Sequence, residues 1–390
     1  MEEKKTVGNS LHSAAEAGDV AEIESLLGLG FSIDRRDDAG LTSLMMAVVN
    51  DKLQAVKCLL KQGADPSLQD NDGWNVLHSA SQGGNPEVIE LMLSHVPNID
   101  SETKVGATPL MIAAGNDNLQ AVKYLLKQGT DPSLQDNDGW NVLHYASQGG
   151  NPELIELMLS HLPSIDSVTK EGITPLMMAA VNDKLHAVRC LLKQGADPSL
   201  QNNGWNVLHY TSQGGNPEVI ELMLSHVPSI DSITKEGASP LMIAAGNDKL
   251  QAVKCLLKKG ADPSLQNNDG WNVLHYASQG GSPEFIELML NYVPSIDSVT
   301  KEGVTPLMIA VVNDKLQAVK CLLKQGADPS FQDDRGFIVL HHASRSGNFA
   351  IMEEILSHGV DIESRNNSSE TPLMLAQSYG KSEAVAYLLR

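Results

Sequence analysis

Apolar and polar residues follow a helical period in short runs along almost the whole chain. In residues 303–328, an apolar set at Leu307, Ala310 and Val311 is followed by a second set that runs from Leu316 to Leu323. Apolar residues three and four positions apart line one face of a helix, so each set predicts a short amphipathic helix. Because the residues between the sets are polar, the segment is predicted to be helix–turn–helix.

The residues that flank these helices indicate where each helix begins and ends. Thr305 is a good N-cap, and Pro306 suits the first helical position, where no amide hydrogen is needed. Gly326 supplies the left-handed conformation in which helices commonly end. Two helices of this length cannot bury their apolar faces alone, so neighbouring segments are expected to stack.

The same pattern recurs at a fixed spacing, which indicates a repeat architecture. The glycines that open the segments lie 33 residues apart, except for one step of 32 residues. They are Gly40, Gly73, Gly106, Gly139, Gly172, Gly204, Gly237, Gly270, Gly303 and Gly336. The short segment has QNNG where its sisters have QDNDG or QNNDG, so we expect a shorter turn there, with Asn202 and Asn203 displaced.

The pattern G-x-T-P-L-x-x-A-A followed by V-x-x-L-L-x-x-G-A-D resembles the ankyrin repeat. The resemblance implies an all-α solenoid of stacked helix-turn-helix units, joined by projecting β-turn loops, that binds partner proteins. It covers residues 7–390 as a single array of about twelve units. These are an N-terminal capping unit at 7–39, ten units over 40–368 and a C-terminal capping unit at 369–390, preceded by a tail at 1–6.

Two unit types alternate, so the chemical period is about 66 residues. One type keeps the family's Thr-Pro but has Met in place of His, as in TPLM at 108–111. The other keeps His without Thr-Pro, as in NVLH at 75–78. The resemblance implies that this helix-one histidine ties neighbouring turns together by hydrogen bonds. It occurs as His78, His144, His209, His275 and His341.

Charges also alternate in sign from unit to unit, at one position of the second helix. That position holds Glu24, Lys57, Glu90, Lys123, Glu156, Arg189, Glu221, Lys254, Glu287, Lys320 and Glu353. Stacked helices lie roughly 8–10 Å apart, so long side chains from neighbouring units can meet. The alternation suits a device that fixes the register of the stack. It is equally explained by duplication of a 66-residue block.

Composition narrows the classes of partner and compartment. A formal charge of −20 disfavours nucleic acids and anionic membranes, because phosphate binding relies on basic patches. No run approaches the roughly 18 apolar residues of a membrane span, and no apolar run follows the charged N-terminus as in a secretory signal. Four cysteines without C-x-x-C spacing occupy one apolar position of the second helix: Cys58, Cys190, Cys255 and Cys321. They indicate small core residues in a reducing compartment, the cytoplasm or the nucleus.

Motifs for catalysis, metals or cofactors are missing from the sequence. It contains no H-E-x-x-H, no Cys or His pair with metal spacing and no G-x-S-x-G. Gly380, Lys381 and Ser382 match the end of a phosphate-binding loop, but the glycine required five residues before Gly380 is Leu375. We therefore predict a protein that is not an enzyme and that holds no cofactor or metal.

An aromatic residue follows the turn glycine in every second unit. The series is Trp74, Trp140, Trp205, Trp271 and Phe337. The intervening units place a smaller apolar residue there, such as Ile173. In ankyrin repeats this position faces the concave side, near the turn tips. The turns add negative charge through Asp72 and Asp138, and the first helices place Gln148 and Gln213 beside the rings.

Two interpretations of the aromatic series stay open. Tryptophan is enriched among binding hot spots, which favours a row of anchors for a partner. Alternatively, each ring covers the neighbouring turn and histidine and belongs to the core. Exposed residues are copied as faithfully as core residues, which indicates recent duplication or a repetitive ligand.

Together these features predict a non-catalytic protein-binding scaffold or adaptor that uses the concave face and the turn tips. The negative rim and the apolar row predict a protein or peptide partner with basic and apolar residues. We expect the chain to be a monomer that binds no nucleic acid and does not insert into membranes. The alternative is a mechanical or spacer solenoid that positions other proteins and has no dedicated ligand.

Overall fold

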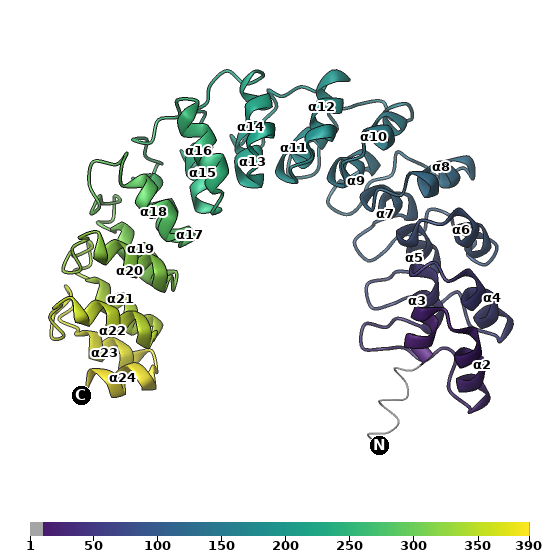
Figure 1. Ribbon diagram of the computed structural model, residues 1–390, viewed down its shortest axis with the longest axis horizontal. Helices are drawn as coiled ribbons and strands as arrows, with labels where there is room; N and C mark the ends of the chain where they lie inside the picture. The colour runs from purple at the N-terminus through teal and green to yellow at the C-terminus, as the bar shows by residue number, and fades with distance from the viewer. Residues whose placement is uncertain (1–10, 390) are drawn as a thin grey trace. The chain divides into compact units, whose positions relative to one another are not determined.

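The computed structural model describes residues 11–389, in which helices follow one another in pairs (Figure 1). The predicted tail at residues 1–6, residues 7–10 of the predicted N-terminal unit and Arg390 lie outside the described part. Apart from isolated β-bridges at three of its turns, the described chain consists of helices and irregular connections. The predicted all-α class is therefore confirmed. The chain divides between Asp197 and Pro198 into two compact units.

The first unit, up to Asp197, begins with a helical segment at residues 11–17. The first helices of its repeats are α3 (Ser43–Val49), α5 (Val76–Gly83), α7 (Pro109–Gly115), α9 (Val142–Gly149) and α11 (Pro175–Val181). Its second helices are α2 (Val20–Gly28), α4 (Leu53–Lys61), α6 (Pro86–Leu93), α8 (Leu119–Lys127), α10 (Pro152–Leu159) and α12 (Leu185–Lys193). From α3 to α11, each first helix packs against the first helix of the next repeat. Second helices also pack against one another, as α2 does on α4 and α10 does on α12.

The second unit, from Pro198, repeats this arrangement. Its first helices are α13 (Val207–Gly214), α15 (Pro240–Gly246), α17 (Val273–Gly280), α19 (Pro306–Val312), α21 (Val339–Ser346) and α23 (Pro372–Ser378). Its second helices are α14 (Pro217–Leu224), α16 (Leu250–Lys258), α18 (Pro283–Met289), α20 (Leu316–Lys324), α22 (Phe349–Ser357) and α24 (Ser382–Leu388). First helices again form a continuous stack, from α13 to α23.

Two kinds of N-cap start the first helices. In the Thr-Pro repeats, Thr305 Oγ1 accepts a hydrogen bond from the Met308 amide at 3.3 Å, and α19 begins at Pro306 as predicted. In α5, α9, α13 and α17 an Asn takes the place of Thr, as in Asn75, whose Oδ1 accepts from the Leu77 amide at 2.9 Å, whereas α21 has Ile338 there and no side-chain cap. Asn is as strong an N-cap as Ser or Thr, so the loss of Thr-Pro leaves the four Asn-capped helices stabilised at their start.

In the repeats that have it, the buried histidine of the first helix links its repeat to the next turn, as the resemblance implied. The Asn206 amide donates to His209 Nδ1 at 3.1 Å, so Nε2 carries the proton and donates to Ser232 O at 3.0 Å. Equivalent contacts join His78 to Ser101, His144 to Ile173, His275 to Val304 and His341 to Glu370. Burial lowers the pKa of His209 and His275 to about 4, which keeps both rings neutral at pH 7.

The turn before Trp205 is one residue shorter than its sisters and differs from them in form, as predicted. In a sister turn the Asp70 amide donates to Trp74 O at 2.9 Å, across residues 71–73. In the short turn Asn202 and Trp205 exchange both backbone hydrogen bonds, at 2.9 and 2.8 Å. The residues between them, Asn203 and Gly204, have φ of 49° and 79°. Positive φ at both positions makes a tight type I′ turn, for which Asn-Gly is well suited.

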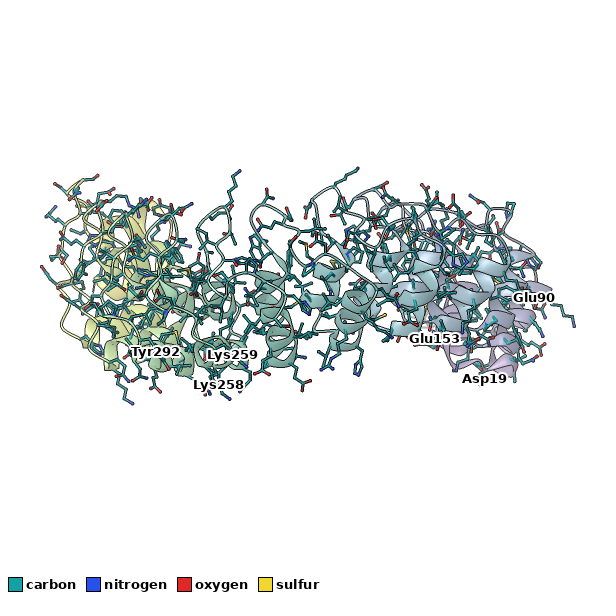
Figure 2. The ribbon with its side chains drawn as sticks, turned by 90° about the horizontal axis from the view of Figure 1, so that it is seen from above. Asp19, Glu90, Glu153, Lys258, Lys259 and Tyr292 are labelled. Atoms are coloured by element: carbon teal, nitrogen blue, oxygen red, sulfur yellow. The ribbon has the colours of Figure 1, made fainter. Side chains whose placement is uncertain are left out.

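The second helices have a charged outer surface and an apolar inner one. Glu90 on α6, Glu153 on α10 and Lys258 on α16 are exposed, and Figure 2 shows them among the side chains along these helices. The inner side holds the predicted core cysteines, which are 7–8% exposed and whose pKa is raised by burial: Cys58, Cys190, Cys255 and Cys321. In the described residues, no helix combines the length and the apolar composition that a membrane span requires.

Lysines of the alternating series form ion pairs between repeats, but their partners are not the residues expected from the sequence. Lys123 pairs with Glu153 at 2.8 Å, and Lys254 pairs with Glu284 at 3.4 Å. These glutamates lie in the first turn of the next second helix, and no pair between equal positions occurs in residues 11–389. Helical side chains lean toward the helix N-terminus, which brings the long lysine to that first turn. The expected partner was therefore wrong. Each exposed pair contributes only about 0.2–1 kcal/mol.

Candidate protein-binding surface

The aromatic series lies where each projecting turn joins a first helix. Its members are all half-buried: Trp74 and Trp140 in the first unit, and Trp205, Trp271 and Phe337 in the second. The turn holds the residue in place, because Asp70 Oδ1 accepts hydrogen bonds from the amides of Asp72 and Trp74, both at 2.8 Å. Each ring is thus packed on one part and exposed to solvent on another. This state is intermediate between the two interpretations drawn from the sequence, exposed anchors and core rings.

Each ring packs against its own first helix. The Trp140 ring centroid lies 6.1 Å from that of His144 and 5.5 Å from that of Tyr145. Tyr145 Oη donates to Asp136 Oδ2 at 2.7 Å, and burial, helped by this carboxylate, raises the pKa of Tyr145. This tyrosine is not among the site residues predicted from the sequence, although it directly follows the repeated histidine. Equivalent ring pairs are Trp205–Tyr210 and Trp271–Tyr276, both at 5.4 Å.

In the second unit, one ring also packs on the next repeat. Trp205 contacts a buried cluster formed by Ala238, Met242 and Ile243, and Tyr276 of the following repeat packs against the same cluster. One patch therefore joins three successive repeats. Trp205 consequently contributes to the packing between repeats as well as to the surface.

A cavity of about 290 Å³ brings several predicted features together in the first unit. Trp74 and Gln82 line it from one repeat, and Leu41, Val49 and the turn residue Asp72 line it from the repeat before. Its lining thus combines aromatic, aliphatic and carboxylate groups. Such a cavity suits a ligand that has an apolar side chain next to a positively charged one.

The remaining predicted residues occupy equivalent places in other repeats. Asp138 is exposed on the turn before Trp140, and Gln148 is exposed on α9. Gln213 on α13 is half-buried. Ile173 is half-buried too, and its carbonyl accepts the hydrogen bond from His144 at 3.0 Å. Ile173 therefore serves the link between repeats in addition to lining the surface.

A family model described as ankyrin repeats (3 copies) matches the chain in overlapping stretches that reach from residue 11 to residue 390. The stretches are 11–105, 44–136, 110–202, 150–234, 176–267, 241–333 and 307–390. The chain belongs to the ankyrin-repeat family. The resemblance drawn from the repeated motifs is thereby confirmed, and ankyrin repeats are protein-interaction modules.

Several known proteins are similar to this ankyrin-repeat chain. Human transient receptor potential cation channel subfamily A member 1 is 26% identical over an alignment of 436 residues, which covers 97% of this chain and 36% of that protein. Inversin from Canis lupus familiaris is 31% identical over 233 residues, with 57% and 21% covered. The nuclear factor NF-kappa-B p105 subunit from Gallus gallus is 30% identical over 213 residues, with 52% and 22% covered. The chain thus spans about a third of the first relative's length and about a fifth of the other two.

Proposed function

We propose that this ankyrin-repeat protein is a non-catalytic scaffold or adaptor, which holds a partner protein against its turn tips and first helices. The cavity beside Trp74 carries this proposal. It offers a half-buried tryptophan, aliphatic walls from Leu41 and Val49, and the carboxylate of Asp72 around one open pocket. Buried aromatic anchors surrounded by polar rims are the usual centres of binding energy at protein interfaces.

The partner that fits this cavity is a peptide segment with an apolar side chain between basic residues. The carboxylates of Asp70 and Asp72 line the cavity, and the chain as a whole carries a formal charge of −20. The same charge repels nucleic acids and anionic membrane surfaces. We infer that a single array over residues 7–390 acts as a monomer. Its buried, separated thiols suit the reducing interior of a cell, in the cytoplasm or the nucleus.

A spacer role is the second candidate, and the packing of Trp205 favours it. A ring that seals a cluster of Ala238, Met242 and Ile243 stabilises the stack without any partner. In that case the aromatic series sets the stiffness of the array, and the cavity beside Trp74 has no ligand of its own.

The Trp74→Ala substitution separates these functions. With a fluorescein-labelled peptide of alternating Lys and Leu residues as the probe, we expect binding to weaken by about 2 kcal/mol or more if Trp74 is an anchor. The helical circular dichroism signal should stay unchanged. Leu29→Ala is the matched control, because Leu29 is an apolar residue that is 74% exposed and outside the cavity. If Trp74→Ala unfolds its neighbours and binding falls only in proportion, the ring belongs to the core and the spacer role stands.

A further inference from the structure

The repeat that opens at Gly336 differs from its sisters where the candidate cavity forms. Arg335 occupies the place of Asp72, His342 that of Ser79, and Arg345 that of Gln82. These substitutions exchange acidic and neutral side chains for basic ones. They lie within a sequence whose other repeats are copied closely, so their clustering at one cavity is a property of this repeat.

An equivalent cavity of about 340 Å³ is present at this place in the second unit. Val312 lines it as Val49 lines the cavity of the first unit, Arg335 lines it from the turn before Gly336, and His342 and Arg345 line it from the next repeat. The repeat after that adds Tyr379 and Lys381. The two cavities therefore share their position in the repeat and their aliphatic wall, but they have opposite charge.

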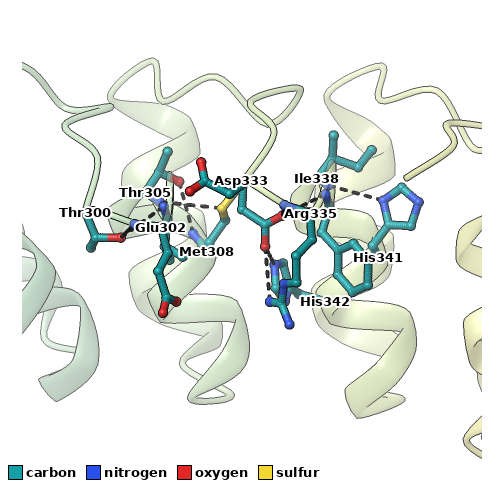
Figure 3. Close-up of polar contacts among 12 residues, drawn as sticks. Thr300, Glu302, Thr305, Met308, Asp333, Arg335, Ile338, His341 and His342 are labelled. Carbon is teal, nitrogen blue, oxygen red and sulfur yellow. Dashed lines mark hydrogen bonds and ion pairs between the residues drawn. The ribbon is translucent and has the colours of Figure 1, made fainter. Parts of the chain in front are cut away.

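One of the cations is already paired inside the protein. Arg335 Nη2 lies 3.2 Å from Oδ2 of Asp333, whose side chain is 1% exposed, and the guanidinium also lies 4.8 Å from the centre of the Phe337 ring. His342 Nε2 is 3.3 Å from the same carboxylate oxygen, and Figure 3 shows His342 and Arg335 converging on Asp333. Burial lowers the pKa of His342 to about 4, so this ring is neutral at pH 7. The charge of Asp333 is thus balanced by Arg335.

The other two cations are available to a ligand. Arg345 lies over the Tyr379 ring, with its guanidinium carbon 5.3 Å from the ring centre, which holds the side chain at the cavity. Neither Arg345 nor Lys381 forms an ion pair within residues 11–389. Tyr379 is 52% exposed and Val312 is 55% exposed, so apolar surface lies beside these charges. Unpaired cations next to apolar surface complement a ligand in which a carboxylate lies beside an apolar side chain.

We propose that this cavity binds an acidic peptide segment, with a carboxylate held by Arg345 and Lys381 and an apolar side chain against Tyr379 and Val312. A guanidinium presents a planar fork of hydrogen-bond donors that matches a carboxylate. The contact is therefore directional as well as electrostatic. This partner goes beyond the proposed function, because its chemistry is opposite to that of the basic, apolar segment at the first-unit cavity. The net charge of −20 argues against a nucleic acid as the occupant.

The test uses the full chain and a fluorescein-labelled peptide, Leu-Glu-Asp-Glu-Leu, with Leu-Gln-Asn-Gln-Leu as its uncharged counterpart. The double variant Arg335→Asp with Arg345→Gln restores the residues of the sister repeats, in which the same turn and helix already form. We expect the acidic peptide to bind the native protein at least about tenfold more tightly than the counterpart, and the double variant to lose at least about tenfold in affinity. Lys381→Gln, which removes the other unpaired cation, should weaken binding in the same direction.

Lys258→Glu with Lys324→Gln is the matched control, since it changes the net charge equally at exposed positions on α16 and α20. This control should bind the acidic peptide as the native protein does, and melting temperatures should confirm that all variants fold. Equal affinity for the two peptides would overturn the proposal. So would equal losses in the double variant and the control, or binding of a single-stranded oligonucleotide in place of the peptide.

Discussion

His209 shows how a single buried side chain couples the stability of the stack to pH. Its Nδ1 accepts from the Asn206 amide and its Nε2 donates to Ser232 O, an arrangement that requires the neutral ring. Its folded-state pKa of about 4 lies below the ordinary histidine value of 6.5. Between these values the unfolded chain binds more protons than the folded chain. The stabilisation is therefore present above pH 6.5 and is lost as the pH falls toward 4.

We predict that the free energy of unfolding decreases as the pH falls from 7 to 4.5. His209 and His275 each contribute up to about 3 kcal/mol over the whole transition, at about 1.4 kcal/mol for each pH unit between the two pKa values. His209→Gln should destabilise the protein by about 1–3 kcal/mol at pH 7, because it leaves buried partners unpaired. The difference from the native protein should shrink at pH 4.5. Urea unfolding at both pH values measures this.

The exposed His226 provides the control, because His226→Gln removes an imidazole without disturbing the links between repeats. It should change the stability little at either pH. A His209→Gln variant whose destabilisation is as large at pH 4.5 as at pH 7 would show that protonation of this ring does not limit the stability of the stack.

The short turn at Asn202–Trp205 shows what one deleted residue does to an element. In the sister turn, Asn267 Oδ1 accepts from the Asp269 and Trp271 amides at 2.9 and 2.8 Å, and the Gly270 amide donates to Asn267 O at 3.0 Å. The side-chain amide of Asn202 donates to Tyr210 Oη at 3.2 Å, as that of Asn267 donates to Tyr276 Oη at 3.0 Å. Within residues 11–389, the Gly204 amide donates no hydrogen bond to the backbone. The short turn is tighter but has fewer protected amides.

We therefore predict that the Gly204 amide exchanges with solvent at least about tenfold faster than the Gly270 amide, since only the latter has to break a hydrogen bond first. Inserting Asp between Asn203 and Gly204 recreates the sister sequence NNDG and should slow the exchange of this glycine. Deleting Asp269 from the sister turn should do the reverse. Amide exchange followed by NMR measures both, and similar rates at the two native glycines would contradict the prediction.

The sequence predicted those features of the helices that depend on local chemistry. The start of α19 at Pro306 and of α20 at Leu316 follows from capping residues and apolar spacing, which act within a few residues. The partner of Lys123 depends on how far the helices of neighbouring repeats are offset and on the direction of its side chain, so spacing alone predicted the wrong glutamate. Tyr145 was missed because its contact with Trp140 exists only once the turn folds back on the first helix.

The candidate site was predictable where it repeats and was missed where it does not. Trp74 and Asp72 were singled out because the same residues recur, and the structure places both in one cavity. Arg335 and Arg345 are visible in the sequence only as departures from the repeat, and their common cavity depends on packing between repeats. In a chain of near-identical copies, the departures carry information about function that the copies do not.

For the whole molecule, the two cavities respond to the same net charge in opposite ways. A formal charge of −20 attracts a basic peptide from a distance and repels an acidic one. The Debye length falls from about 30 Å at 0.01 M salt to about 8 Å at 0.15 M, so salt removes the long-range field before it weakens contacts at short range. At the cavity of Arg345 and Lys381, local attraction therefore has to overcome global repulsion.

We predict that the association rate of the alternating Lys and Leu peptide falls as salt rises from about 0.01 to 0.15 M, because screening removes a favourable field. Over the same range, the association rate of Leu-Glu-Asp-Glu-Leu should stay constant or rise, because screening removes the repulsion while the contacts with Arg345 and Lys381 persist. Stopped-flow fluorescence anisotropy measures both rates, and the uncharged Leu-Gln-Asn-Gln-Leu corrects for general effects of salt. If the acidic peptide slows as steeply as the basic one, its association is driven by a long-range positive field that this chain does not have, and it binds elsewhere than the proposed cavity.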